Sequence, residues 1–295
     1  FEALVEVELQ GAGAEQDCPT AVIVVEEGEE VIPQTVLHLD GSQSYAPYGP
    51  VVKWLWEVEE PEGSQEKFVP TASDSNPVFA ANVVGVYTFR LRVWDQNNTE
   101  SCSPGEFKVV VQPDQAIHVE LTWVTPGDPD ETDDGHGKGT DLDLHFAHAQ
   151  ASGPDLDGDG DPDPWFDEKW DCFWHNAEPD WASFDPTAND DPVLDRDDTD
   201  GAGPENLFLA VPQDQSLYRI GVHFWADHGF GEVIATVKVY SYDQLIYEIT
   251  DVTLKERDMW CVGYVSWPDP AVVPCKDGEP MWIVPDYVNP FFFTP

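Results

Sequence analysis

The sequence predicts an all-β protein built from two antiparallel β-sandwich domains. Short alternating or β-branched runs recur along it, as in VYTFRLRVWD at 86–95 and IATVKVYSYD at 234–243. Many of the 26 prolines and 22 glycines separate these runs, where turns are needed. Apolar residues rarely repeat at helical spacing. Short strands between turn residues are typical of sandwiches.

The composition is that of a folded and very acidic protein. Of the 295 residues, 41% are hydrophobic and 12% aromatic, which is too rich for a disordered acidic tail. The formal net charge of −45 repels phosphate backbones and anionic membranes, so we expect no nucleic-acid partner. No apolar run has the length of a transmembrane segment.

The chain opens with a predicted half-buried strand, FEALVEVELQ, in which apolar residues alternate with polar ones. The flexible GAGAEQ follows, so residues 1–17 are predicted to form a terminal strand and linker outside the first domain. The apolar face of this strand would include Phe1, Val5, Val7 and Leu9.

Residues 18–113 are predicted to form the first domain. Trp54 and Trp56 share one strand face, and alternate residues of 86–95 are apolar, which gives one core-facing row on each sheet. The LDGSQS turn, the WLW strand and the GVYTFRLRVWD strand occur in an order that resembles a PKD-type (polycystic kidney disease) domain. The resemblance implies an immunoglobulin-like extracellular spacer or adhesion module and not a catalyst.

After the linker QPDQA, a second domain is predicted over residues 117–275, with three acidic elements. In DLDLH, Asp141 and Asp143 would project from the same side of a strand. Calcium takes six to eight oxygen ligands, and glycine lets closely spaced carboxylates converge, so these elements predict structural calcium sites. The loop DLDGDGDPD contributes Asp155, Asp157, Asp159 and Asp161, and LDRDDTDGAGPE contributes Asp195, Asp197, Asp198, Asp200 and Glu205.

The motifs DLDLH, CFWHNAEPDW, DDTDGAGPENLFL and YRIGVHFW together resemble an uncharacterised bacterial secreted β-sandwich family that often follows a PKD-type domain. Over residues 117–268 the resemblance implies a jelly-roll-like domain with acidic metal-binding loops, and it implies no activity. Two alternatives stay open: the acidic loops are solvated without an ion, or Asp141 and Asp143 cap backbone amides of a neighbouring loop.

Five widely spaced cysteines favour disulfides and an oxidising, extracytoplasmic setting. Cys18 precedes the first strand of the first domain and Cys102 follows a late one, so a bridge between them would tie down the start of the domain. Cys261 and Cys275 lie equally far from the central proline of WPDPAVV, where a hairpin would bring them together. Cys172 is then the odd thiol, although its pairing with either of these two stays open.

Three segments have competing interpretations. The aromatic acidic stretch from 164 to 184 either offers sugar-binding rings or forms its own small core. The proline-punctuated tail, residues 276–295, and the N-terminal strand either cover their own subunit or insert into a neighbour and build a fibre. The candidate glycan-binding residues are Trp165, Trp170, Trp174 and Trp181, and those for assembly in the tail are Phe291, Phe292 and Phe293.

These predictions combine into a secreted, non-enzymatic protein whose signal peptide has been removed. No catalytic motif is recognisable, because the chain lacks G-x-S-x-G, H-E-x-x-H and a glycine-rich phosphate loop. We expect a structural or adhesive surface protein with structural calcium, whose partners are further copies of itself or other surface proteins. The alternative is a carbohydrate-binding module that uses the aromatic loop.

Overall fold

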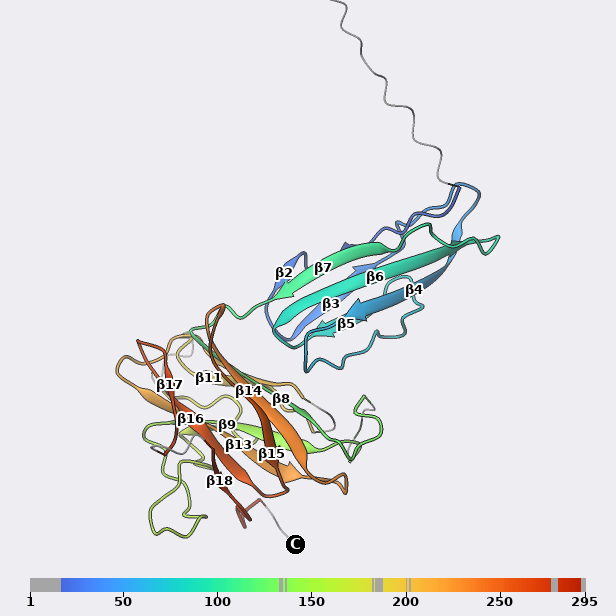
Figure 1. Cartoon of the computed structure of the whole chain (residues 1–295). Helices are drawn as coiled ribbons and strands as arrows, with labels where there is room; N and C mark the ends of the chain where they lie inside the picture. The colour runs from blue at the N-terminus through green and yellow to red at the C-terminus, as the bar shows by residue number, and fades with distance from the viewer. Residues whose placement is uncertain are drawn as a thin grey trace, which may run out of the picture.

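The structure is a computed structural model that describes residues 17–132, 135, 137–181, 183, 188–199, 201, 203–276 and 281–292. Within this part of the chain the only regular elements are strands, and they form two sandwiches, one above the other in Figure 1. The predicted all-β class is confirmed. The N-terminal strand predicted for residues 1–10 lies outside the described residues.

The first sandwich packs a three-stranded sheet, ordered β1-β3-β5, on a four-stranded sheet, ordered β2-β7-β6-β4. All of its pairings are antiparallel except the parallel pair β2 and β7. Its strands are β1 (Val24–Val25), β2 (Glu30–Val31), β3 (Thr35–Asp40), β4 (Val51–Glu59), β5 (Val78–Ala81), β6 (Gly85–Asp95) and β7 (Gly105–Val111).

The core of the first sandwich follows the alternation of β6. Its inward row, Tyr87, Phe89, Leu91 and Val93, is fully buried against Trp56 of β4. The half-buried Trp54 also faces this core, and the indole Nε1 atoms of Trp54 and Trp56 donate hydrogen bonds to the backbone oxygens of Gly41 and Asp74, both at 2.9 Å. Each buried ring therefore has its polar atom satisfied.

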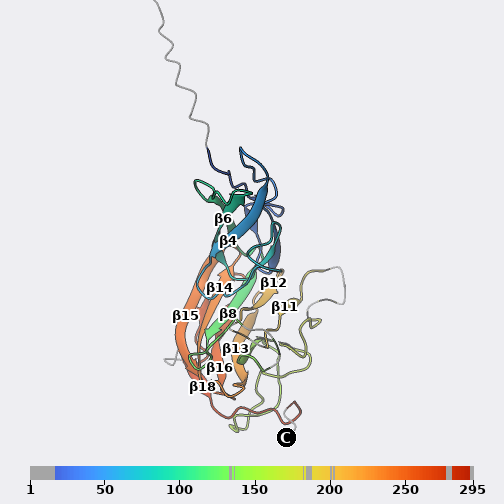
Figure 2. The same cartoon turned by 90° about the vertical axis from the view of Figure 1, so that its right-hand side faces the viewer.

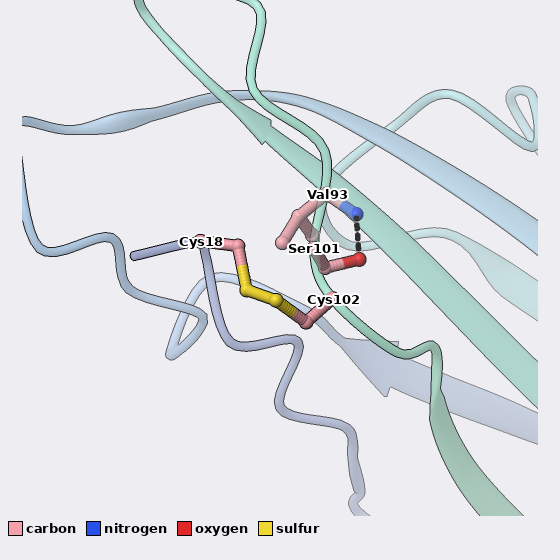
Figure 3. Close-up of a disulfide and its surroundings, with 4 residues drawn as sticks. All are labelled: Cys18, Val93, Ser101 and Cys102. Carbon is pink, nitrogen blue, oxygen red and sulfur yellow. Dashed lines mark hydrogen bonds between the residues drawn. A yellow bond between two sulfur atoms is a disulfide. The ribbon is translucent and has the colours of Figure 1, made fainter. Parts of the chain in front are cut away.

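A disulfide between Cys18 and Cys102 joins the segment before β1 to the connection between β6 and β7 (Figure 3). Beside it, the Val93 amide donates a hydrogen bond to Ser101 Oγ at 3.3 Å, and the Ser101 amide donates to the Val93 carbonyl at 2.8 Å. This is the bridge that the sequence predicted, and it fixes the start of the first sandwich to the connection between β6 and β7.

The second sandwich packs a six-stranded sheet on a five-stranded one. The six-stranded sheet has the order β10-β9-β13-β16-β17, with β18 also paired to β16, and the five-stranded sheet has the order β11-β12-β8-β14-β15. The strands are β8 (Ile117–Val124), β9 (Asp141–His148), β10 (Asp171–Cys172), β11 (Pro192–Arg196), β12 (Glu205–Leu209), β13 (Leu217–Ala226), β14 (Val233–Ser241), β15 (Gln244–Leu254), β16 (Met259–Ser266), β17 (Val272–Val273) and β18 (Trp282–Val284).

A third layer covers the outer face of the six-stranded sheet. It consists of the connection between β9 and β10, Phe173 and Trp174 directly after β10, and residues 281–292, and its side chains form a separate apolar cluster around Trp165, Phe166, Phe173 and Tyr287. Strand β9 is therefore buried along both of its faces, including its charged residues. The aromatic stretch thus forms its own small core, one of the two alternatives for this segment.

The tail packs on its own domain over the residues that the structure describes. Strand β18 pairs with Met259–Cys261 of β16, and the disulfide between Cys261 and Cys275 fastens the intervening hairpin. Cys172 remains a buried thiol, and its Sγ donates to the carbonyl of Ala177 at 3.3 Å. Both disulfides join the cysteines that the sequence paired.

The two sandwiches lie next to each other along the chain (Figures 1 and 2), and polar contacts join them. The amide of Val84 donates to Glu120 Oε2 at 2.7 Å, and Asn206 Nδ2 donates to the carbonyl of Asn82 at 3.2 Å.

A search of the described residues for a membrane-spanning helix, which must be both long and apolar, finds none.

Candidate metal centre

The candidate site lies on the face of the six-stranded sheet that the third layer covers. Along β9, Leu142 and Leu144 enter the core between the two sheets, so Asp141 and Asp143 point to the opposite face. Strand β13 runs antiparallel beside β9 and places His223 directly opposite Asp143. Two carboxylates therefore stand side by side on a rigid pair of strands.

The loop between β11 and β12 adds a third carboxylate. Asp141, Asp143 and Asp197 each offer an oxygen, and these oxygens lie within 4.8 Å of one another. An isolated β-bridge between Thr140 and Gly201 holds the loop beside the start of β9. Residues more than fifty positions apart in the sequence thus converge on one point.

Glu205 and Gly203 fix the end of this loop. Glu205 is fully buried; its Oε2 accepts a hydrogen bond from the Leu144 amide at 2.6 Å, and its Oε1 accepts one from the Asp198 amide at 3.2 Å. Gly203 has a φ of +80°, and a Cβ there would lie 2.7 Å from the ring of Trp123. The turn therefore requires glycine, and Glu205 attaches it to β9.

The electrostatics of the site are unfavourable for the protein alone. Burial raises the pKa of both the Asp143 and Glu205 carboxyls and the charge of Asp197 raises both further, whereas His145 acts to lower the pKa of Asp143 without cancelling the effect of burial. Asp143 is only 3% exposed, and its Oδ2 has no hydrogen-bond partner among the described residues. The nearest ring, His223, lies with Nδ1 3.7 Å from this oxygen, but burial lowers the pKa of His223 to about 4, so at neutral pH it supplies no charge.

The donor set suits a hard cation. Carboxylate oxygens are the ligands that calcium and magnesium prefer, whereas zinc and copper sites are usually built from histidine nitrogen and cysteine sulfur. Above the three carboxylates lies an open cavity of about 210 Å³, whose other lining residues are Trp174, Thr199 and Trp225. A cation held here would keep part of its coordination sphere open to the cavity.

The second acidic element, the loop at 155–163, is organised differently. Asp155, Asp157 and Asp163 also offer three oxygens within 4.8 Å of one another. The two oxygens of Asp155, however, accept hydrogen bonds from glycine amides of the loop at 2.8 and 3.1 Å. Asp159 and Asp161 are exposed and lie outside the trio, and Asp159 accepts the amide of Asp161 at 2.8 Å.

The residues of the third acidic element, 194–205, lie in different surroundings. Asp197 joins the buried site, and Asp198 is buried beside it, with its Oδ2 3.0 Å from a guanidinium nitrogen of Arg196. Asp195 is exposed and lines a different cavity, beside His118 and Asn206, so it does not belong to the cluster. Asp200 lies outside the described residues.

The predicted aromatic platform needs correction. Trp165 and Trp181 are buried at 4% and 6% exposure, because Trp165 belongs to the third layer and Trp181 stacks on Phe146 and Tyr218 in the core. Neither ring is accessible to a glycan. Trp170 and Trp174 are half-buried, and the structure brings only Trp174 to the acidic cavity.

The residues predicted to take part in assembly also differ in their positions. Phe1, Val5, Val7, Leu9 and Phe293 lie outside the described residues. Phe292 packs in the third layer, with its ring centroid 5.3 Å from that of Trp174, so it covers its own subunit. Phe291 is 69% exposed.

The sequence analysis missed three residues of these clusters. Asp163 belongs to the loop trio, and Thr199 and Trp225 line the cavity of the buried site. Trp225 follows His223 by two positions on a predicted strand, so the shared strand face was the one available signal.

In the first sandwich the structure shows a further exposed contact between charged groups. His38 Nδ1 and Glu27 Oε1 lie 2.6 Å apart.

Three solved structures are similar to this chain over different lengths. A solved PKD domain from the KIAA 1837 protein is 27% identical, covers 34% of this chain and 90% of its own, and has a TM-score of 0.25. A structure of carbohydrate-binding modules of the β-sandwich superfamily is 11% identical, covers 78% of this chain and 99% of its own, and has a TM-score of 0.26. The FN1–FN3 domains of chicken CNTN1 are 11% identical, cover 82% of this chain and 93% of their own, and have a TM-score of 0.22.

No curated protein matches the sequence. A family model, the K319L-like PKD domain, matches residues 29–111. PKD-type domains are typically non-catalytic, and the domain and the two disulfides are consistent with an extracellular location. Residues 29–111 therefore form a PKD-type domain, which is the body of the first sandwich.

Proposed function

We propose that the protein is a non-enzymatic, extracellular structural or adhesive protein whose second sandwich is braced by calcium. The ion would be held by Asp141, Asp143 and Asp197. The observation that carries the proposal is the Asp143 carboxylate, which is buried, has an Oδ2 without a hydrogen-bond partner among the described residues, and faces two further carboxylates.

The alternative to a cation is protonation of the buried acids. An uncompensated buried charge is strongly unfavourable, so without an ion Asp143 and Glu205 would have to bind protons near neutral pH. Such protons would relieve the repulsion but would add no link between the Asp197 loop and β9 beyond the Thr140–Gly201 bridge and the hydrogen bonds of Glu205. A divalent ion satisfies both requirements, because it neutralises the charge and joins the two segments.

Calcium is favoured over magnesium by the irregular setting of the ligands. Magnesium requires near-ideal octahedral geometry, whereas calcium accepts six to eight oxygens in flexible arrangements. Here two ligands stand on one strand and the third on a loop, and an open cavity leaves room for additional oxygens. Calcium is also available outside cells, the location with which the two disulfides are consistent.

The site supports a bracing role because its loop leads to the other domain. Arg196 lies between the two sandwiches, with guanidinium nitrogens 3.0 Å from Asp198 Oδ2 and 3.0 Å from Glu66 Oε1. Glu66 belongs to the first sandwich. An ion that orders the 197–201 segment would therefore also order this contact between domains.

The test is calorimetry of the full chain in millimolar calcium and in EDTA, with calcium binding measured by titration. Binding at a thousandfold excess over Kd contributes about 4 kcal/mol, which corresponds to roughly 8–16 °C in the midpoint of a domain of this size. An equal midpoint in calcium and EDTA would contradict the proposal. Magnesium at the same concentration serves as the matched control and should give a smaller shift.

Assembly through strand donation remains part of the proposal for residues 1–10. The described part of the chain offers an acceptor in β15, an eleven-residue strand at the edge of the five-stranded sheet with mostly exposed or half-buried side chains. An edge strand of this length can accept a further strand through its main-chain groups. Deletion of residues 1–13 should leave a folded monomer that no longer assembles, and unchanged assembly in electron micrographs would exclude donation.

A further inference from the structure

The cavity above the three carboxylates has an aromatic wall that bracing does not require. Trp174 comes from the third layer and Trp225 from β13, and their ring centroids lie 5.4 Å apart with an interplanar angle of 72°. Both rings are half-buried, and together with Thr199 they line the same cavity of about 210 Å³ as Asp141, Asp143 and Asp197. Carboxylates and indoles thus share one open space.

Two buried polar atoms of the residues that line this cavity lack hydrogen-bond partners within the described part of the protein. Oδ2 of Asp143 is one of them, on a side chain that is 97% buried, and Nε1 of Trp174 is the other. A buried donor or acceptor without a partner is unfavourable, so such atoms are usually satisfied by a ligand, an ion or water. A calcium ion satisfies the carboxylate but cannot satisfy an N–H donor.

The coordination of the ion leaves room for a second ligand. If each of the three carboxylates binds through one or two oxygens, calcium with six to eight ligands retains free positions on the side of the cavity. Two neighbouring hydroxyl groups of a sugar ring can fill two such positions. A third hydroxyl can accept the Trp174 N–H, and the apolar face of the ring can pack against an indole, as in other sites that combine aromatic walls with a few polar groups.

The negative charge of the protein favours neutral saccharides over anionic ones. A chain with a net charge of −45 repels anionic polysaccharides, and its acidic residues surround this cavity. A neutral saccharide meets no such repulsion.

We infer that this cavity binds a neutral saccharide with vicinal hydroxyl groups, which coordinate the calcium held by Asp141, Asp143 and Asp197 while the ring packs on Trp225 or Trp174. The inference rests on the proposed calcium site and gives that site a ligand. It differs from the platform that the sequence suggested, because Trp225 lies outside the aromatic stretch and Trp165 and Trp181 are buried.

The experiment uses the full chain and two kinds of probe. Affinity electrophoresis through mannan, galactan, xyloglucan and dextran surveys neutral polysaccharides, and titration calorimetry with the methyl glycosides of mannose, galactose and fucose measures affinity for a single ring. Each is run in millimolar calcium and in EDTA. We expect retardation by at least one polysaccharide in calcium and none in EDTA.

Two variants locate the binding. Trp225→Ala should weaken saccharide binding at least tenfold while still binding calcium, because the indole supplies no metal ligand. Trp94→Ala is the matched control, since Trp94 is half-buried on β6 of the first sandwich beneath Lys53 and should bind like the wild type. If Trp225→Ala unfolds, Trp174→Phe, which removes the N–H and keeps an aromatic ring, should still weaken binding.

The outcomes separate this inference from the proposed function. A protein that binds calcium but none of the saccharides overturns the inference and leaves the calcium site standing. Saccharide binding that survives both EDTA and Trp225→Ala places the sugar elsewhere and also overturns it. Absence of calcium binding in the titration removes the proposed function and the inference together.

Discussion

The acids around Asp143 and the acids of the 155–163 loop are alike in sequence and opposite in physical situation. In the loop, Asp159 is exposed and its neighbour Asp155 accepts two backbone amides, so the charge is solvated or hydrogen-bonded. At Asp143 the charge is buried and Oδ2 has no hydrogen bond from the described residues. A candidate cation site is therefore better chosen by burial without hydrogen-bond donors than by the density of aspartate.

Asp171 is a third case, because it is also buried and its Oδ1 has no hydrogen-bond partner among the described residues, but its other oxygen has partners from the protein itself. Its Oδ2 lies 2.7 Å from His145 Nδ1 and accepts the amide of Phe166 at 2.7 Å. Removal of one member of a buried pair usually costs about 3–5 kcal/mol. We expect Asp171→Asn to lose this amount in urea unfolding, equally in calcium and in EDTA. A loss that depends on calcium would contradict this distinction.

Asp143→Asn should show the opposite dependence on calcium. In calcium, the loss of one ligand that weakens binding about a hundredfold removes roughly 2.7 kcal/mol of stability. In EDTA at pH 8 the same variant should be at least as stable as the wild type, because the buried charge is gone. Urea unfolding in the two buffers measures both effects, and equal destabilisation in both would show that Asp143 binds no ion.

The pH dependence of stability in EDTA tests why Asp143→Asn should destabilise the protein in calcium but not in EDTA. The pKa values of Asp143 and Glu205 are raised above the ordinary values of 3.8 and 4.5, so the folded state binds more protons than the unfolded state above that range. Their contribution to stability is present in acid and is lost as pH rises through the raised pKa values. From pH 5 to pH 8 the midpoint of the wild type should fall at least about 3 °C further than that of Asp143→Asn. Calcium should remove this difference, and parallel curves in EDTA would contradict the assignment.

The smallest effect is expected at the exposed loop. Asp159→Asn should change stability by less than about 0.5 kcal/mol, in calcium or in EDTA, because the side chain is exposed and lies outside the trio of nearby oxygens. A calcium-dependent loss at Asp159 equal to that at Asp143 would mean that the two acidic regions are alike after all. Calorimetry of the two variants side by side decides this.

The fold was predictable where the pattern is local. The alternation of Tyr87, Phe89, Leu91 and Val93 predicts the inward row of β6, and the same rule puts Asp141 and Asp143 on one side of β9. The burial of that side was not predictable. It depends on a third layer formed by the aromatic stretch and the tail, which meet only after the chain has folded.

The candidate site was predictable in part for the same reason. Asp197 belongs to an acidic motif, whereas Trp225 reaches the cavity only because β13 pairs with β9, with Ala226 opposite Asp141. Asp195 belongs to the same motif as Asp197 but lies outside the cluster, since it still stands on β11, whereas Asp197 lies in the loop that follows this strand. Residue type and spacing supply candidates, and strand pairing selects among them.

The bridge between Cys18 and Cys102 changes how the PKD-type domain would respond to mechanical tension. A pull between Asp17 and the linker passes from Cys18 directly to Cys102 and then along β7, so strands β1 to β6 lie in a closed ring beside the line of force. The bond spans 84 positions, which would otherwise release roughly 290 Å of extended chain. While the disulfide is intact, the domain can extend only a little under load. Reduction of the disulfide would allow the enclosed chain to extend.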